Sequence, residues 1–226
     1  MLNVFLFVLL TAFTSVTDCI YINKAVKRPL QYLTYYVLAK DVKDVKTLNT
    51  RPLARAGVRV LSYDGPDMAV GSGTLIGGEY VLTAKHVVEG RKAVIVQFEN
   101  GFPVPAFLAF KLKNLDIAVL RVHGLNAQRL RLNRPQVGDV GILFGHPGFT
   151  ERETTRIIVS QVLLHPSQDM TIEEYIVFSC NGVRPGYSGA AVFNQDGDII
   201  GVMSFYYPSL GICFAVSSNE IVTTLN

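Results

Sequence analysis

From Val58 onward, short apolar runs alternate with clusters of turn-forming residues. The runs are rich in Val, Ile, Leu and Phe, and Gly, Asn, Asp and Pro separate them at intervals of about ten residues. Twelve segments have this character: 58–63, 73–77, 79–84, 93–99, 107–112, 116–122, 140–145, 156–164, 175–180, 189–194, 197–206 and 211–217. The pattern is typical of β-strands joined by tight turns and predicts an all-β fold.

The number of predicted strands narrows the architecture. Twelve strands exceed one small sandwich and suit two packed antiparallel barrels or a larger sandwich. The stretch Asn133-Arg134-Pro135 lies near the middle of the strand region. Because Pro135 cannot donate a ladder hydrogen bond, we expect the connection between two barrels here.

The first 56 residues have a different pattern. Residues 4–13 read VFLFVLLTAF and carry no charge. This run is too short for a comfortable membrane span. We interpret residues 1–17 as a cleaved secretory signal, although a basic start and a small-x-small cleavage site are missing. An uncleaved membrane anchor and a buried strand are the alternatives. Residues 18–56 form a predicted N-terminal arm, in which residues 30–45 have the pattern of a short amphipathic helix.

Charge and cysteine content exclude some classes of function. The net charge of the 226-residue chain is +3, and its Lys and Arg residues are scattered, so nucleic-acid binding is not expected. The three cysteines, Cys19, Cys180 and Cys213, match neither a zinc site nor a dense disulfide framework. A bridge between Cys180 and Cys213 stays open, but we expect two buried free thiols.

Two short segments of the strand pattern contain a histidine and an aspartate that could act together as an acid–base pair. The segment LTAKHVVEG has His86 at the end of a predicted strand, and a histidine can take and return a proton near neutral pH. The segment NLDIAVLRV opens on Asp116, thirty residues later (116 − 86). A carboxylate there suits an imidazole N–H, because it fixes the tautomer of the ring. Taken singly, each residue is explained as well by an ordinary turn histidine or a strand-capping aspartate.

The segment GVRPGYSGAAVFN is the most specific signature. Gly186 and Gly189 bracket Ser188 in a tight turn before a strand, which exposes the hydroxyl. Glycine tolerates the backbone angles of such a turn, and the N–H groups of Gly186 and Ser188 would point at one spot where a carbonyl oxygen becomes an oxyanion. Taken alone, a glycine-rich hairpin without chemistry explains the segment as well.

The chain order of these residues excludes one class of hydrolase. The nucleophile elbow of α/β-hydrolases needs strand, turn and helix, and its histidine comes last. Here a strand follows Ser188 and His86 comes first, which is the order of chymotrypsin-type barrels. The remaining histidines lie next to Gly or Pro without metal-ligand spacing, so we expect neither metal nor other cofactor: His123, His146 and His165.

Five segments together resemble the trypsin-like serine proteases of the HtrA (high-temperature-requirement A) group. They span 71–90, 115–122, 137–149, 186–202 and 211–221. The resemblance implies two six-stranded antiparallel barrels of the chymotrypsin fold within a protease domain over 57–226, at about 57–132 and 136–226. It also implies a serine endopeptidase with His86, Asp116 and Ser188 as catalytic residues and oxyanion donors on Gly186 and Ser188.

The resemblance has departures. Tyr187 stands where the family usually has a small polar residue, so we expect this loop to sit differently. Ala190 replaces a frequent second glycine. No Ile-Val-Gly-Gly start for zymogen activation is visible, which favours control by loop ordering, oligomerisation or removal of the arm. We expect no PDZ-like domain after Asn226.

The resemblance also assigns substrate contacts. Ser204 and Phe205 lie on the strand that pairs with the substrate backbone, and Ser204 is expected near Asp116. Gly182 stands six residues before the nucleophile where trypsin-like enzymes have Asp, so a preference for Lys or Arg is not supported. Ile212 predicts a shallow apolar pocket for small or medium aliphatic side chains.

Two other functions stay open. One is a catalytically silent peptide-binding module in which Tyr187 blocks the oxyanion hole, and the other is an esterase on the same residues. The expected partner is a protein or peptide substrate, while a homo-oligomer and membrane association through residues 1–17 stay open. We expect a secreted, periplasmic or membrane-associated protein, and a viral polyprotein origin is a further alternative.

Overall fold

The computed structural model describes residues 49–166, 172–179 and 182–225. The helices of these residues are α3 (Thr50–Ala56), α4 (Lys85–Val88) and α5 (Ser218–Leu225). Their strands are β1 (Gly57–Asp64), β2 (Asp67–Gly77), β3 (Tyr80–Thr83), β4 (Ala93–Gln97), β5 (Pro103–Lys111), β6 (Ala118–Arg121), β7 (Val140–Gly145), β8 (Glu153–Pro166), β9 (Ile172–Ser179), β10 (Ala191–Asn194), β11 (Ile199–Tyr207) and β12 (Ile212–Ser217).

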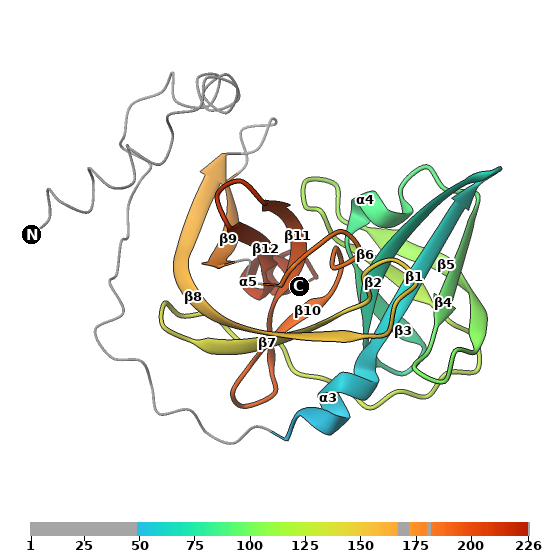
Figure 1. Cartoon of the computed structure of the whole chain (residues 1–226), viewed down its shortest axis with the longest axis horizontal. Coiled ribbons are helices and arrows are strands. Elements are labelled where there is room, and N and C mark those ends of the chain that lie inside the picture. Colours follow the sequence, from blue (N-terminus) through green and yellow to red (C-terminus); the bar gives the residue numbers. More distant parts are fainter. Residues whose placement is uncertain (1–48, 167–171, 180–181, 226) are drawn as a thin grey trace, which may run out of the picture. The chain divides into compact units, whose positions relative to one another are not determined.

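The strands close into two antiparallel barrels (Figure 1). The first has the order β1-β2-β3-β6-β5-β4 and the second the order β10-β11-β12-β9-β8-β7. Each of the twelve predicted segments overlaps one strand, so the prediction of two six-stranded barrels is confirmed. β6 ends at Arg121 and β7 begins at Val140, and the predicted connection at 133–135 lies between them.

Alternation of side chains fills each barrel with apolar residues, because successive residues of a strand face opposite sides. The core of the first barrel is built mainly from small branched residues, among them Val58, Val60, Val81 and Val96. The core of the second barrel contains larger side chains, among them Leu143, Phe178, Ile200 and Met203. These buried side chains explain why the apolar runs of the sequence recur with turns between them.

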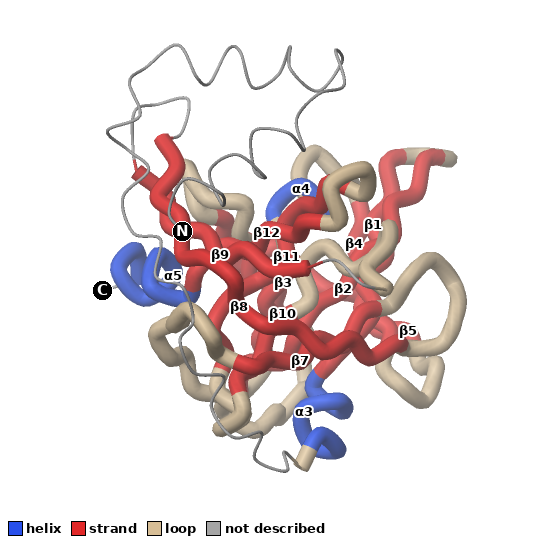
Figure 2. The backbone as a smooth tube through the Cα atoms, turned by 60° about the vertical axis from the view of Figure 1, so that its left-hand side comes forward, coloured by secondary structure: helices blue, strands red, loops and turns tan. Residues whose placement is uncertain are grey.

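A third apolar cluster joins the barrels. Leu82, Ile117 and Val119 of the first barrel pack with Val202 and Val216 of the second. Because Leu82 and Val119 lie on β3 and β6, the packing brings the ends of these strands close to β11 (Figure 2). The segments that carry His86, after β3, and Asp116, before β6, lie next to this cluster between the barrels.

The N-terminal predictions fall mostly on residues that the structure does not describe. The leader at 1–17 and the helix at 30–45 lie outside the described residues. The described end of the predicted arm is α3, which Asn49 caps by accepting a hydrogen bond from the Arg51 N–H at 3.4 Å. Leu53 of α3 packs against Phe193 in the second barrel. Within the described ranges, no helix is long and apolar enough to cross a membrane.

One expectation about the cysteines is wrong. Cys213 is fully buried in β12 and takes part in a disulfide bond, rather than being a free thiol. The partner lies outside the described residues. The pairing of β12 with β9 places Cys213 opposite Phe178, so the fold brings it beside a segment far back in the sequence. This proximity depends on strand pairing, and cysteine spacing alone does not reveal it.

Candidate active site

His86 lies on α4, just after β3, rather than at the strand end that the sequence predicted, and Asp116 lies two residues before β6. β3 and β6 pair antiparallel, with Thr83 opposite Ala118, so the segment that follows β3 and the segment that precedes β6 lie at the same edge. Asp116 Oδ1 accepts a hydrogen bond from the His86 backbone N–H at 2.9 Å, and its Oδ2 lies 2.7 Å from His86 Nδ1. Because an ionised carboxylate only accepts hydrogen bonds, Nδ1 carries the proton and Nε2 is available as a base.

Ser204 connects this pair to the second barrel. Its side chain is 4% exposed on β11, and its hydroxyl donates a hydrogen bond to Asp116 Oδ2. Asp116 therefore receives donors from its own barrel and from the other one. This network holds the imidazole in one orientation, since both oxygens of the carboxylate are engaged.

Ser188 lies in a turn whose shape depends on two glycines. Gly186 has φ of +104° and Gly189 has φ of +90°, which side chains rarely adopt. A Cβ on Gly186 would lie 2.6 Å from the His146 carbonyl oxygen, and one on Gly189 would lie 2.1 Å from the Ser72 carbonyl oxygen. The turn therefore needs glycine for both its angles and its close contacts.

Two N–H groups of this turn have no acceptor within the described residues, those of Gly186 and Ser188. The neighbouring N–H groups are paired: Tyr187 with the Arg184 carbonyl at 3.2 Å, Gly189 with the Met203 carbonyl at 2.7 Å, and Ala190 with the Tyr187 carbonyl at 2.9 Å. Backbone donors seldom remain unpaired in a buried segment. A pair of free donors beside a serine hydroxyl is suited to binding an oxyanion.

The serine hydroxyl itself has a different partner from the imidazole. Ser188 Oγ donates to the carbonyl oxygen of Ser204 at 3.3 Å. No hydrogen bond joins Ser188 to His86 among residues 49–166, 172–179 and 182–225. The fold thus brings the three predicted catalytic residues to one junction, with Ser204 contacting both Asp116 and Ser188.

Tyr187 lies away from the proposed oxyanion position. Its side chain is 1% exposed and belongs to the core of the second barrel. Its hydroxyl lies 3.1 Å from Thr155 Oγ1 and 3.3 Å from Glu153 Oε2. The ring fits because Gly145 has no side chain; a Cβ there would lie 2.3 Å from the ring. The hypothesis that Tyr187 blocks the oxyanion hole is therefore wrong, because the phenol points into the barrel.

Aromatic residues flank the other predicted substrate contacts. Phe205 is 39% exposed and stacks on Phe214 with ring centroids 4.6 Å apart. Tyr207 contacts both rings edge-on. Ile212 is half-buried and pairs with Tyr207 toward the tip of the hairpin, so it lies farther along the strands than Phe214 does. The stacking of Phe214 on Phe205 was not predicted from the sequence, because it follows from the register of β11 and β12.

The remaining histidines show no metal site. Within the described residues, no group of three His, Cys, Asp or Glu side chains is arranged to hold a metal ion. His123 lies against Phe107 with ring centroids 5.4 Å apart, and His146 is buried. The side chain of His165 is outside the described residues.

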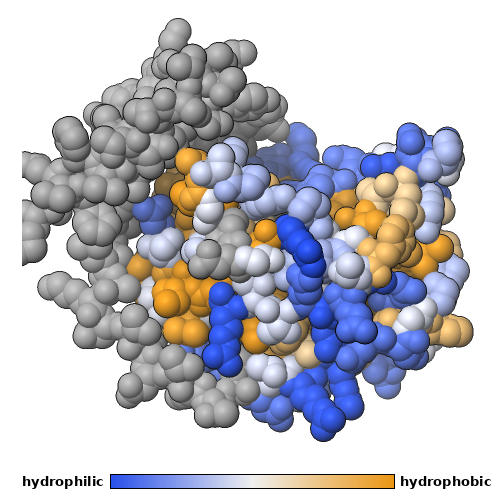
Figure 3. All heavy atoms as spheres, in the orientation of Figure 1, coloured by the Kyte–Doolittle hydropathy of each residue, from blue (hydrophilic) through white to orange (hydrophobic). Residues whose placement is uncertain are grey.

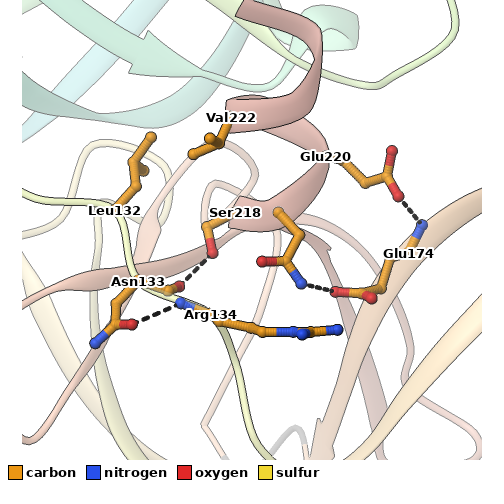
Figure 4. A pocket seen from close by; sticks show the side chains of 8 residues that line it. Leu132, Asn133, Arg134, Glu174, Ser218, Glu220 and Val222 are labelled. Atoms are coloured by element: carbon orange, nitrogen blue, oxygen red, sulfur yellow. Dashed lines mark hydrogen bonds between the residues drawn. The ribbon is translucent and has the colours of Figure 1, made fainter. Parts of the chain in front are cut away.

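A polar cavity of about 540 Å³ lies elsewhere, beside α5 (Figure 4). There, the Ser218 hydroxyl donates to the Asn133 carbonyl, and Glu220 accepts from the Glu174 N–H at 3.0 Å. Burial raises the pKa of the Glu220 carboxyl, and nearby carboxylates add to the rise. None of the predicted site residues lines this cavity.

Comparisons with known proteins were made for sequence and for structure. A probable periplasmic serine protease of Haemophilus influenzae, described as do/HhoA-like, is 32% identical over 162 residues, covering 67% of this chain and 34% of the relative. The chain thus spans about one third of the curated relatives it matches. The crystal structure of a serine endoprotease from Yersinia pestis superposes with a TM-score of 0.67 and 25% identity over 78% of this chain and 63% of that one.

A second solved structure is the HtrA-type protease AlgW with a tripeptide. It has a TM-score of 0.69 and 26% identity over 78% of this chain and 60% of that one. The family model described as trypsin-like peptidase domain matches residues 71–202, which is more than half of the 226 residues. The matched range includes His86, Asp116 and Ser188 and confirms the resemblance seen in the sequence. The chain therefore belongs to the family of trypsin-like peptidase domains.

Proposed function

We propose that this chain is a serine endopeptidase in which Ser188 is the nucleophile, His86 the general base and Asp116 the group that orients His86. The observation that carries the proposal is the doubly hydrogen-bonded His86–Asp116 pair beside a serine turn with two free N–H donors. The printed names of the relatives, which are serine proteases and endoproteases, support the same activity.

In the proposed reaction, His86 Nε2 takes the proton of Ser188 Oγ while Oγ bonds to the peptide carbonyl carbon. The carbonyl oxygen becomes an oxyanion that the N–H groups of Gly186 and Ser188 stabilise. The imidazolium gives its proton to the leaving amine as the C–N bond breaks, which leaves an acyl-enzyme. Water then adds to the acyl carbon, with His86 again as base, and releases the acid and Ser188. No metal or organic cofactor enters these steps.

In this scheme, substrate binding releases the Ser188 hydroxyl from the Ser204 carbonyl. Ser188 Oγ donates to the Ser204 carbonyl, which lies on β11 where an extended substrate would pair. A substrate N–H that binds this carbonyl competes with the hydroxyl for it. In the proposed reaction the released hydroxyl then turns to His86 Nε2, which acts as the general base. Such tightening on substrate binding is common at sites with loose hydrogen bonds in the free enzyme.

The expected specificity is for small or medium aliphatic side chains at the cleaved position. Gly182 offers no carboxylate to a basic side chain, and Ser204, Phe205 and Ile212 supply the proposed contacts. The aromatic surface of Phe205 and Tyr207 favours apolar residues nearby in the substrate. Protein or peptide substrates agree with the tripeptide bound to AlgW.

Export is proposed for this chain as well. The relatives are described as periplasmic, and residues 1–17 have the apolar character of a leader or anchor. We therefore propose a periplasmic, secreted or membrane-associated location. Cell fractionation of a tagged chain, with the N-terminus of the mature protein sequenced, checks both the location and the fate of residues 1–17.

The second candidate function is a catalytically silent peptide-binding module. The hydrogen bond from Ser188 to Ser204, rather than to His86, favours it. An esterase on the same residues is a weaker third candidate. The full chain and its Ser188→Ala variant should be incubated with a mixed peptide library and with simple esters. Peptide cleavage that the variant lacks supports the endopeptidase, ester turnover alone supports the esterase, and binding without turnover supports the silent module.

A further inference from the structure

Ser72 occupies an unusual place between the two barrels. It lies in β2 of the first barrel, is fully buried, and is flanked by Gly71 and Gly73. A Cβ on Gly71 would lie 2.7 Å from a methyl of Val87 and 3.0 Å from the Ser188 carbonyl oxygen. The glycine therefore lets the backbone of β2 approach the serine turn of the second barrel closely.

Each polar group of Ser72 is hydrogen-bonded. Its N–H donates to the Ser188 carbonyl at 2.8 Å, and its hydroxyl donates to the Gly186 carbonyl at 2.6 Å. The hydroxyl oxygen accepts from the His146 N–H at 2.9 Å, and the Ser72 carbonyl accepts from Thr83 Oγ1 at 2.7 Å. One residue thus holds two carbonyls of the turn that carries the proposed nucleophile.

These two carbonyls belong to the residues whose N–H groups are free. The backbone can rotate easily at Gly186, because a glycine, with φ here of +104°, has no side chain to resist rotation. The Ser72 hydroxyl limits this rotation by holding the Gly186 carbonyl. The Ser72 N–H holds the Ser188 carbonyl, and the Tyr187 carbonyl between them accepts from Ala190. Each peptide group is planar, so the Tyr187 carbonyl held by Ala190 fixes the direction of the Ser188 N–H. The Gly186 and Ser188 carbonyls held by Ser72 fix the peptide groups that follow these two residues, which restricts the backbone rotations at Gly186 and Ser188 that would turn their N–H groups away.

We propose that Ser72 is a positioning residue that keeps the N–H groups of Gly186 and Ser188 aimed at the oxyanion. The inference rests on the proposed function, because it assigns a role in the same reaction. Ser72 does not touch substrate and acts through the backbone of the turn. The Ser72 hydroxyl makes the contacts with Gly186 and His146, and a mutation can remove these two contacts without changing the backbone.

The test compares Ser72→Ala with the full-length wild-type chain. The alanine keeps the backbone hydrogen bond to Ser188 and loses both hydroxyl contacts. Removing a whole oxyanion donor lowers kcat by about 10²–10³-fold, so misaligned donors should lower kcat roughly 10- to 100-fold, with KM changed little. A peptide boronic acid, which forms a tetrahedral adduct with the serine, should bind more weakly by a similar factor. Peptide affinity, measured with Ser188→Ala as background, should stay the same.

Ser218→Ala is the matched control. Ser218 is also buried, and its hydroxyl donates to a backbone carbonyl distant in sequence, that of Asn133, away from the serine turn. It should leave kcat and boronic-acid affinity unchanged. Ser72→Cys keeps the size of the side chain and a weak donor, so its kcat and boronic-acid affinity should lie between those of the wild type and Ser72→Ala. It replaces Ser72→Ala in the test if the alanine variant does not fold.

Three outcomes overturn the inference. Unchanged kcat in folded Ser72→Ala does so directly. Parallel losses of peptide and boronic-acid affinity, together with a lower unfolding temperature, indicate a purely structural role. A wild-type chain that neither cleaves peptides nor binds the boronic acid overturns the proposed function, and the inference with it. Wild-type activity separates the first two outcomes from the third.

Discussion

The two barrels contribute to the candidate active site in different ways. The first barrel supplies His86 from α4 and Asp116 from the segment before β6, and the pairing of β3 with β6 brings the two residues together. The second barrel supplies Ser188 on a turn that is held by Met203 and the Tyr187 ring of its own barrel and by Ser72 of the other. The His86–Asp116 pair therefore comes from one barrel and receives one contact from the other, through Ser204, whereas the turn that carries Ser188 and its free N–H groups is held from both barrels.

The outer surfaces of the two barrels are alike, because both expose some apolar side chains. Figure 3 shows apolar patches over β8 and over strands of the first barrel, with hydrophilic residues between them. Exposed apolar side chains occur on both, such as Ile158 at 47% and Phe107 at 56%. Scattered exposure of this kind is ordinary for a folded domain. The candidate site therefore depends on the contacts between the barrels and not on their outer surfaces.

Asp116→Asn tests the part of the site that lies within one barrel. The amide cannot hold the imidazole in the tautomer that the carboxylate fixes, so kcat should fall about 10⁴-fold. The fold should persist, because the side chain keeps its shape. Asp67→Asn, at an exposed position of the first hairpin, is the control and should leave peptide turnover unchanged. Near-normal turnover by Asp116→Asn would contradict the assigned role.

The pH dependence of stability tests the junction between the barrels. Burial and then the charges of Arg59 and Arg152 lower the pKa of His146 to about 4, against the opposing charge of Glu99. The unfolded imidazole has a pKa of about 6.5, so the unfolded state binds more protons between about pH 6.5 and 4. The free energy of unfolding should therefore drop by up to about 3 kcal/mol as the pH falls through this window.

Urea unfolding at several pH values measures this effect. His146→Gln should flatten the dependence between about pH 6.5 and 4, whatever its effect at neutral pH. His123→Gln is the control, since the His123 side chain is 62% exposed. Equal slopes for wild type and His146→Gln would show that His146 is not the group that titrates.

Ser204→Ala breaks a contact between the barrels at the site. It removes the hydroxyl that donates to Asp116 Oδ2 from β11. A hydrogen bond to a charged group contributes about 1.5–3 kcal/mol, so kcat should fall at least tenfold if the imidazole becomes less well held. Ser209→Ala, exposed in the β11–β12 hairpin, should have no effect. Steady-state kinetics on one peptide decide between these outcomes.

Tyr187→Phe has the smallest expected effect and tests the anchor of the serine turn within the second barrel. It keeps the ring in the core and removes the hydroxyl that contacts Thr155 and Glu153. The free energy of unfolding should fall by about 1 kcal/mol, with little change in kcat. Tyr206→Phe is the control, because Tyr206 is a partly buried tyrosine that packs against the same core. A large loss of kcat in Tyr187→Phe would show that this anchor also positions the donors.

The sequence predicted the fold well because strands are local patterns. Short apolar runs separated by turn residues identify each strand. Their number left two barrels or a larger sandwich open, and the family resemblance implied the two six-stranded barrels that the structure has. His86, Asp116 and Ser188 were identifiable for the same reason, since each sits in a short local motif next to a strand, although His86 itself lies on α4. Their roles as catalytic residues remain proposals that the mutations above test.

The family resemblance placed Ser204 near Asp116, which the structure confirms, but other contacts between distant segments were not predictable. The direction of the Tyr187 ring depends on the space left by Gly145, forty-two residues earlier (187 − 145). The role proposed for Ser72 depends on the approach of β2 to the serine turn, and the disulfide of Cys213 depends on strand pairing. The Gly-Ser-Gly pattern at 71–73 was the only local signal for Ser72, and it indicates close backbone approach without naming the partner.

Labelling of the full-length chain with a fluorophosphonate tests the proposed nucleophile most directly. The reagent phosphonylates a serine only when a base and an oxyanion site activate it. The adduct should map to Ser188 by mass spectrometry, disappear in Ser188→Ala and form far more slowly in His86→Ala. A chain that is folded by circular dichroism and remains unlabelled at Ser188 would contradict the endopeptidase assignment and favour the silent binding module.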